Sequence, residues 1–147
     1  MPADADSSVL PDLASMGEQC DWLRERLGLH PATVIELVLL DTEQMTRIHV
    51  AYLAEPGPTD VMAFPMDPPV AAGACLPPDA PPPLLGEIVL CPDFIAATDE
   101  PEPLAVRCAL RITHAMLHLI GHDHADDVGR ERMFAEQERL MHDWLQR

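Results

Sequence analysis

Hydrophobic positions along the chain follow two spacings, one typical of amphipathic helices and one typical of buried strands. Apolar residues recur every three or four positions over residues 13–27, and Gly28 follows them, which predicts a helix with one buried stripe. Residues 33–40 are rich in β-branched side chains and almost wholly apolar. This second pattern predicts a strand that is buried on both faces.

A second helix and a short strand are expected next. Asp41 or Thr42 suits the N-cap of the helix, because either side chain can accept a hydrogen bond from a backbone amide of the first turn. The side chains expected to face inward are Met45, Ile48 and Tyr52. Residues 56–58, Pro-Gly-Pro, end this helix, and residues 60–64 are expected to form the strand.

The second half of the chain predicts one more buried strand and three helices. The strand covers residues 84–91, and a short helix covers residues 92–97. A largely apolar helix begins near Leu104, and a last amphipathic helix follows Asp126 or Asp127. The inward stripe of this last helix consists of Met133, Phe134, Gln137, Leu140, Met141, Trp144 and Leu145.

These elements predict an α+β fold in which a small mixed β-sheet packs with helices in a single domain, residues 1–147. Residues 1–11 are polar and carry no periodicity, so we expect a poorly ordered tail. Residues 65–83 hold half of the sixteen prolines. Because proline cannot donate to a sheet, we expect an insertion loop between two strands.

Composition places the chain among soluble proteins. No apolar run approaches the roughly 20 residues that a membrane helix needs, and the N-terminus has neither a basic region nor a hydrophobic signal core. A cytoplasmic protein without a membrane partner is therefore expected. The four cysteines form no C-x-x-C pair and sit mostly in apolar patterns, so we expect buried free thiols rather than disulfides or zinc ligands.

The charge balance argues against a nucleic-acid partner. The formal net charge is -16, and all nine positive charges are arginines. Nucleic-acid binding normally leaves a basic footprint, because it depends on neutralising phosphates. An RNA substrate would therefore require a local positive field from arginines and a metal ion.

Three histidines occupy a characteristic spacing in the segment THAMLHLIGHDH, residues 113–124. His114 and His118 are four residues apart, so on a helix they share one face. Gly121 marks the end of that helix, because glycine readily takes the left-handed conformation after the last turn. The chain can then turn back and bring His124 to the same point. Three imidazole nitrogens around an open fourth position are typical of catalytic zinc, with one ion per chain.

The spacing H-x-x-x-H-x-x-G-x-x-H is the metzincin zinc motif with one change. Those proteases carry a glutamate directly after the first histidine as the general base, whereas this chain has Ala115. A zinc peptidase or amidase is therefore the least favoured hydrolase hypothesis.

Residues 114–124, HAMLHLIGHDH, resemble the signature of the YbeY endoribonucleases, which runs close to H-G-x-L-H-L-x-G-Y-D-H. PTDVMAFP over residues 58–65 and LLGEIVLCP over residues 84–92 resemble two further blocks of that family, in the same order. The resemblance implies a zincin-like fold and a zinc-dependent endoribonuclease specific for single-stranded RNA. It also implies a role in ribosomal RNA maturation and ribosome quality control, with ribosomal RNA and ribosome-associated proteins, not DNA, as partners.

The chain departs from that family where the substrate is expected to bind. Leu53 stands where many members have an arginine that is thought to serve the RNA backbone. Arg111, together with Arg107, lies on the same helical stripe as the histidines and is the expected substitute for that guanidinium. The alternative is that both arginines are solvated or paired with nearby carboxylates such as Glu100 and Glu102.

Apart from a zinc-bound water, the sequence leaves the catalytic groups open. Asp123, His122 and Glu87 are the candidates for the general base, and nothing in the sequence separates them. Asp123 can also orient a ligand imidazole, and His122 is expected to face solvent. Leu53, and Ala63 in place of a family serine, favour an alternative function: a catalytically weakened zinc-binding protein with a ribosome- or RNA-associated role.

Overall fold

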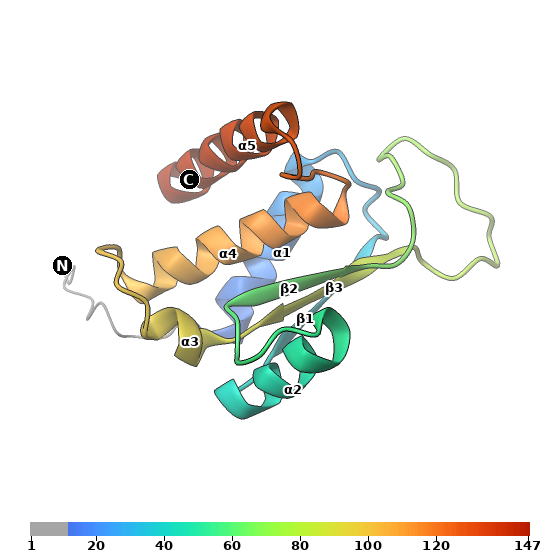
Figure 1. The fold of residues 1–147 in the computed structure, drawn as a ribbon. Coiled ribbons are helices and arrows are strands. Elements are labelled where there is room, and N and C mark those ends of the chain that lie inside the picture. The colour runs from blue at the N-terminus through green and yellow to red at the C-terminus, as the bar shows by residue number, and fades with distance from the viewer. Residues whose placement is uncertain (1–11) are drawn as a thin grey trace.

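The computed structural model describes residues 12–147, so the tail expected over residues 1–11 lies outside the described residues. One sheet forms the centre of the described chain, and helices lie on both of its faces (Figure 1). In chain order the elements are α1 (Leu13–Arg26), β1 (Val34–Leu39), α2 (Thr42–Leu53), β2 (Val61–Pro65), β3 (Leu84–Leu90), α3 (Pro92–Ala96), α4 (Leu104–Leu119) and α5 (Asp127–Gln146). The predicted α+β fold class is confirmed.

The sheet is mixed, as predicted, and β3 lies between β1 and β2. β1 pairs with β3 in parallel, whereas β2 pairs with β3 antiparallel, with Ala63 opposite Ile88. β3 is mostly buried because it has a neighbour on each side. The expectation that β1 is buried on both faces is wrong: β1 is an edge strand, and its Val34 is 38% exposed.

The two faces of the sheet carry different helices. Ile88 of β3 packs with α4 and α1 in the main core, whereas Val89 packs against Met45 of α2 on the opposite face. Gly86 faces α4, since a β-carbon there would lie 2.7 Å from Cδ2 of Leu119 and 2.4 Å from the backbone oxygen of Phe64. The absence of a side chain at Gly86 therefore lets α4 approach the sheet closely.

Helix α2 begins where the capping residues predict. Asp41 is the N-cap, and it forms a capping box with Gln44 in which each side chain accepts a hydrogen bond from the other residue's backbone amide. The inward face of α2 consists of Met45 and His49, with Ile48 partly buried. The inward orientation expected for Tyr52 is wrong, because its side chain is 69% exposed.

The two C-terminal helices, α4 and α5, both contribute to the main core. α4 is buried along most of its length, and it ends next to Gly121, whose φ of 106° lets the chain reverse. α5 begins after its N-cap Asp126 and buries Met133 and Trp144. Phe134 of α5 is 45% exposed, so the buried stripe of this helix is narrower than the predicted one.

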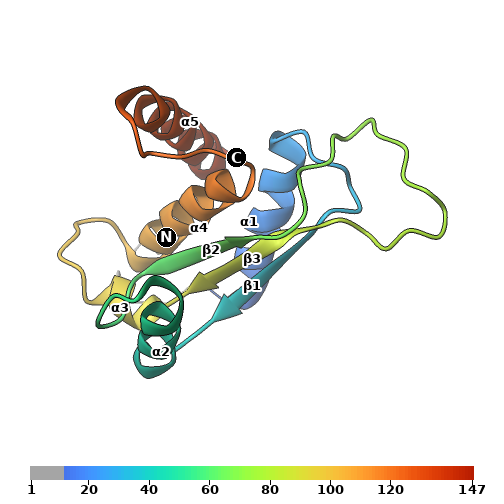
Figure 2. The ribbon, with the colours of Figure 1, turned by 45° about the vertical axis from the view of Figure 1, so that its right-hand side comes forward.

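Residues 66–83 connect β2 to β3 without a named helix or strand and extend away from the sheet (Figure 2). Cys75 lies in this connection and is an exposed free thiol. The other three cysteines are buried free thiols, as expected, and burial raises the pKa of Cys20 and Cys108 to about 11. Within residues 12–147, no helix is both long enough and apolar enough to cross a membrane.

We predict that Gly86→Ala lowers the free energy of unfolding by about 1–3 kcal/mol, because the added methyl group overlaps both Leu119 and the backbone of β2. Urea unfolding followed by tryptophan fluorescence measures the change. Gly73→Ala is the matched control, since a β-carbon at Gly73 meets no atom within 4 Å. An unchanged unfolding midpoint for Gly86→Ala would show that α4 does not pack this closely.

Candidate metal centre

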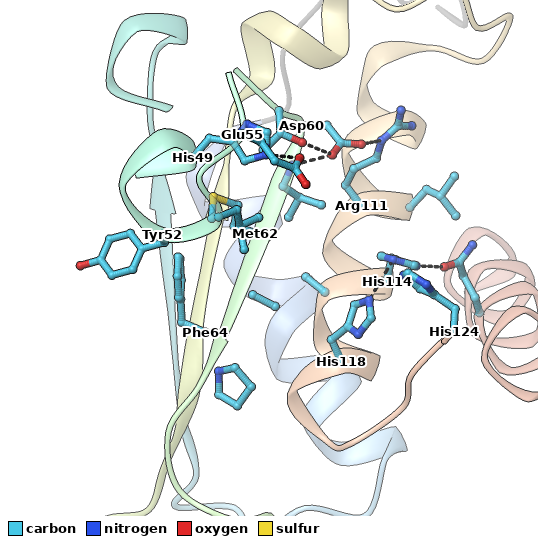
Figure 3. A pocket seen from close by; sticks show the side chains of 18 residues that line it. His49, Tyr52, Glu55, Asp60, Met62, Phe64, Arg111, His114, His118 and His124 are labelled. Carbon is cyan, nitrogen blue, oxygen red and sulfur yellow. Dashed lines mark hydrogen bonds and ion pairs between the residues drawn. The ribbon is translucent and has the colours of Figure 1, made fainter. Parts of the chain in front are cut away.

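Three imidazoles converge at the C-terminal end of α4 (Figure 3). His114 and His118 lie one turn apart on α4, and the turn at Gly121 returns the chain so that His124 completes the cluster. One ring nitrogen from each histidine lies within 4.8 Å of the others, and the Nε2 atoms of His114 and His118 are 3.2 Å apart. The structure thus brings together the three residues that the spacing singled out.

The hydrogen bonds of two rings fix which nitrogen faces the centre of the cluster. Nδ1 of His114 lies 2.8 Å from Oε1 of Gln137, and Nδ1 of His118 lies 3.1 Å from the backbone oxygen of His122. Both oxygens accept hydrogen bonds, so each Nδ1 carries the proton and each Nε2 presents a lone pair. Two lone pairs at 3.2 Å repel one another unless a cation lies between them. This donor set therefore fits a divalent metal.

The environment of His118 also favours the neutral form that a metal requires. Burial is the main cause that lowers the pKa of His118, and the neighbouring His114 and His124 lower it further. Because ligand imidazoles bind metal only when they are deprotonated at the donor nitrogen, this shift favours binding near neutral pH.

Gln137 and the backbone of His122 take the orienting role that was expected of Asp123. The carboxylate of Asp123 instead accepts a hydrogen bond from the amide of Ala125 at 2.9 Å. Gln137 was expected only as part of the inward stripe of α5. Its separation of 23 residues from His114 gives no local signal, so the pairing is visible only in the fold.

The histidines line an open cleft of about 930 Å³ that runs along the free edge of β2, between α2 and α4. One backbone hydrogen bond lies at each end of the pairing of β2 with β3. The amide of Cys91 donates to the oxygen of Asp60 at one end, and the amide of Met66 donates to the oxygen of Leu85 at the other. Because bonding alternates along an antiparallel pair, Ala63 turns its amide and carbonyl away from β3 and toward the cleft.

Arg111 lines this cleft, but carboxylates already hold its guanidinium. Nε lies 2.9 Å from Oδ2 of Asp60, and the two terminal nitrogens lie 2.8 and 2.7 Å from the oxygens of Glu100. These bonds raise the pKa of Arg111, and the hydrogen bonds from Arg111 and then Thr98 lower the pKa of Glu100 to about 2. The pairing with Glu100 was one of the alternatives left open by the sequence, and the structure shows it.

Arg107 does not reach the cleft, so its expected contact with substrate needs correction. The residue is only 7% exposed, and its NH1 donates to the backbone oxygens of Ile95 at 2.9 Å and Thr98 at 3.2 Å. These bonds hold α4 against α3 and the segment that follows it. A buried guanidinium in this position has no access to RNA, and we assign it a structural role.

Glu87 is also separated from the histidines. Gly86 faces α4, and side chains alternate along a strand, so Glu87 points to the α2 face of the sheet. Neither Glu87 nor Asp123 lines the cleft. The carboxylates that do line it are Asp60 and Glu55, and no pattern in the sequence marks either residue as part of the site.

A second histidine environment lies at the α2 end of the cleft. His49 is buried, with Nδ1 2.9 Å from the backbone oxygen of Gly57 and Nε2 3.2 Å from a carboxylate oxygen of Glu55. His49 thus holds the end of α2 against the segment that leads into β2. The sequence signal for this contact was only a histidine on the inward face of a helix.

A family model described as Endoribonuclease YbeY matches residues 13–145. The chain belongs to the YbeY family. Endoribonuclease YbeY from Rhodococcus opacus (strain B4) is 42% identical over 123 residues, which covers 82% of this chain and 68% of that relative. Endoribonuclease YbeY from Mycolicibacterium smegmatis (strain ATCC 700084 / mc(2)155) is 40% identical over 140 residues. This match covers 92% of this chain and 75% of that relative. The resemblance stated from the three sequence blocks is confirmed.

One solved structure shares the fold of this chain. The solution structure of TM1509 from Thermotoga maritima matches with a TM-score of 0.51 and covers 88% of this chain and 78% of the other. The two sequences are 19% identical, so this likeness concerns the fold alone.

We predict that Gln137→Ala weakens the binding of a divalent metal by about 10- to 100-fold, because His114 loses the acceptor that orients its ring. Competition with a chromophoric chelator measures the affinity. Gln137→Glu keeps an acceptor and should retain tight binding. Gln146→Ala, an exposed change at the end of the same helix, is the matched control. Equal affinities for Gln137→Ala and the unaltered protein would remove Gln137 from the site.

We predict that the protein loses stability in acid because the stabilising contribution of Glu100 is lost there. The pKa of the Glu100 carboxyl is 4.5 in the unfolded chain and about 2 in the folded protein. Its contribution to the free energy of unfolding is therefore fully present above pH 4.5 and is lost as the pH falls toward 2. The free energy of unfolding of the unaltered protein should therefore approach that of Glu100→Gln as the pH falls.

Denaturant unfolding at about pH 6 and about pH 3 measures this convergence. Glu102→Gln is the control, because this neighbouring glutamate is exposed and the structure records no partner for its side chain within residues 12–147. A constant difference between the unaltered protein and Glu100→Gln at both pH values would contradict the prediction.

Proposed function

We propose that this protein is a zinc-dependent endoribonuclease that cleaves single-stranded RNA, with one zinc ion held by His114, His118 and His124. The observation that carries the proposal is the convergence of three imidazoles in an open cleft, with two lone pairs directed at a common point. Membership of a family whose relatives are named Endoribonuclease YbeY supplies the reaction class.

His114, His118 and His124 would hold the zinc ion, which would supply Lewis-acid chemistry for phosphodiester hydrolysis by polarising a phosphoryl oxygen and lowering the pKa of a water molecule. The chain supplies the orientation. Gln137 and the His122 carbonyl hold two rings with Nε2 toward the cleft, and His124 is exposed, so the centre is open to a substrate.

The groups around the histidines favour phosphoester over peptide chemistry. Ala115 lines the cleft next to His114, where a metzincin would place its carboxylate base. The carboxylates in the cleft are Asp60 and Glu55, and they replace Asp123 and Glu87 as our candidates for the general base. A zinc peptidase or amidase would lack its usual base.

We further propose that the substrate is ribosomal RNA and that the protein acts in rRNA maturation and ribosome quality control in the cytoplasm, in contact with ribosome-associated proteins. This part rests on the resemblance to the YbeY family. The net charge of -16 repels free polyanions, so recognition must depend on local features of the cleft.

A catalytically weakened zinc-binding protein is the second candidate function. The observation in its favour is the state of Arg111, whose guanidinium is held by Asp60 and Glu100 and is therefore not free to bind phosphate. Leu53 adds to it, because the family arginine is missing from the same cleft.

We predict that the zinc-loaded protein cleaves a single-stranded RNA and that His114→Ala abolishes cleavage and lowers the metal content from about one zinc per chain. Gel analysis of a labelled RNA and elemental analysis measure the two effects. His142→Ala is the matched control, because this histidine is exposed on α5 and does not line the cleft.

Zinc binding without RNA cleavage would support the second candidate. Cleavage that survives in His114→Ala at full rate would overturn the assignment of the histidines as the catalytic metal site.

A further inference from the structure

Two aromatic side chains form an exposed platform at the α2 side of the cleft. Tyr52, the only tyrosine of the chain, is 69% exposed at the end of α2. Its ring packs edge-on against Phe64 of β2, with ring centroids 5.4 Å apart and planes at 67°. Phe64 thus supports the position of the tyrosine, while most of the Tyr52 side chain remains accessible.

The platform and the histidines belong to one continuous cleft. Tyr52 and Phe64 lie on the α2 side of β2, and the histidines lie on the α4 side, with the free edge of β2 between them (Figure 3). An extended ligand that reaches the histidines can therefore cross the edge of β2 and place a further group along its length on the tyrosine ring.

The charges of the cleft make such a platform important for an RNA strand. Among residues 12–147, Arg111 is the only lysine or arginine that lines the cleft, and Asp60 and Glu100 neutralise it. Glu55 adds a further carboxylate at the α2 end, where it contacts the ring of His49. Phosphates therefore find no free cationic side chain among the described lining residues, and affinity must come from the metal and from the bases.

We propose that Tyr52, supported by Phe64, is a stacking platform for one unpaired nucleobase of the RNA strand whose phosphate lies at the histidines. Aromatic side chains bind bases in this way without reading the sequence, because every base has a π-face. A base in a duplex has both faces covered by its neighbours, so the platform selects single strands. This inference rests on the proposed endoribonuclease function and names the binding site that gives it strand preference.

The test compares ring-keeping and ring-removing variants in steady-state cleavage of a short single-stranded RNA. Tyr52→Phe should behave as the unaltered protein. Tyr52→Leu keeps an apolar side chain without a ring and should raise KM by about tenfold, while kcat changes by less than about twofold. Leu13→Ala is the control, because Leu13 is 57% exposed on α1 and does not line the cleft.

A fluorescent base locates the platform directly. Stopped-flow mixing with RNAs that carry 2-aminopurine at successive positions should show quenching by a stacked ring at one position in the unaltered protein and in Tyr52→Phe. Tyr52→Leu should lose the quenching at that position only. Since Tyr52 is mostly exposed, none of these variants should alter the unfolding midpoint.

The outcomes separate the two proposals. If the unaltered protein cleaves RNA and Tyr52→Leu shows the same KM and the same quenching, the platform is overturned and the endoribonuclease function stands. Unchanged RNA kinetics combined with lost binding of a protein partner would instead assign the exposed tyrosine to a protein interface and would also overturn it. If the zinc-loaded protein cleaves no RNA, the proposed function fails and the platform fails with it.

Discussion

The burial of α4 against the sheet is the constraint on which the site depends. Gly86 lets Leu119 reach the sheet, and residues of α1 and α5 cover the other apolar sides of the helix. The one side of α4 that is left open carries His114 and His118 and faces the free edge of β2. A helix packed in this way cannot rotate without exposing its core residues, so packing fixes the direction of both imidazoles before any metal binds.

Arg111 and Arg107 show how one helical stripe serves three purposes. Arg107 holds α4 to α3 through backbone oxygens, and Arg111, one turn further, ties α4 to Asp60 at the start of β2 and to Glu100. The next turn carries His114, which belongs to the histidine cluster. The arginines thus fix the position of α4 relative to β2, and neither of these two guanidinium groups is then free at the mouth of the cleft.

Local signals in the sequence predicted most of the elements, because caps, glycine stops and hydrophobic spacing act over a few residues. The capping box at Asp41 and the turn at Gly121 are examples, and the turn was enough to bring His124 to its partners. Contacts between distant segments were not predictable. The pair of Arg111 and Asp60 spans 51 residues, and the edge position of β1 depends on strand order, which hydrophobicity does not encode.

The backbone of β2 gives an independent reason to favour RNA over a peptide at this centre. In β2, which the structure describes in full, the outward positions are Val61, Ala63 and Pro65. The amide of Val61 donates to the side chain of Asp60 at 2.8 Å, and proline has no amide hydrogen. Ala63 therefore offers the one free outward amide of this strand. A peptide that adds to a sheet edge needs a ladder of such donors, whereas an RNA strand that crosses the edge needs a single one for a phosphate or a base.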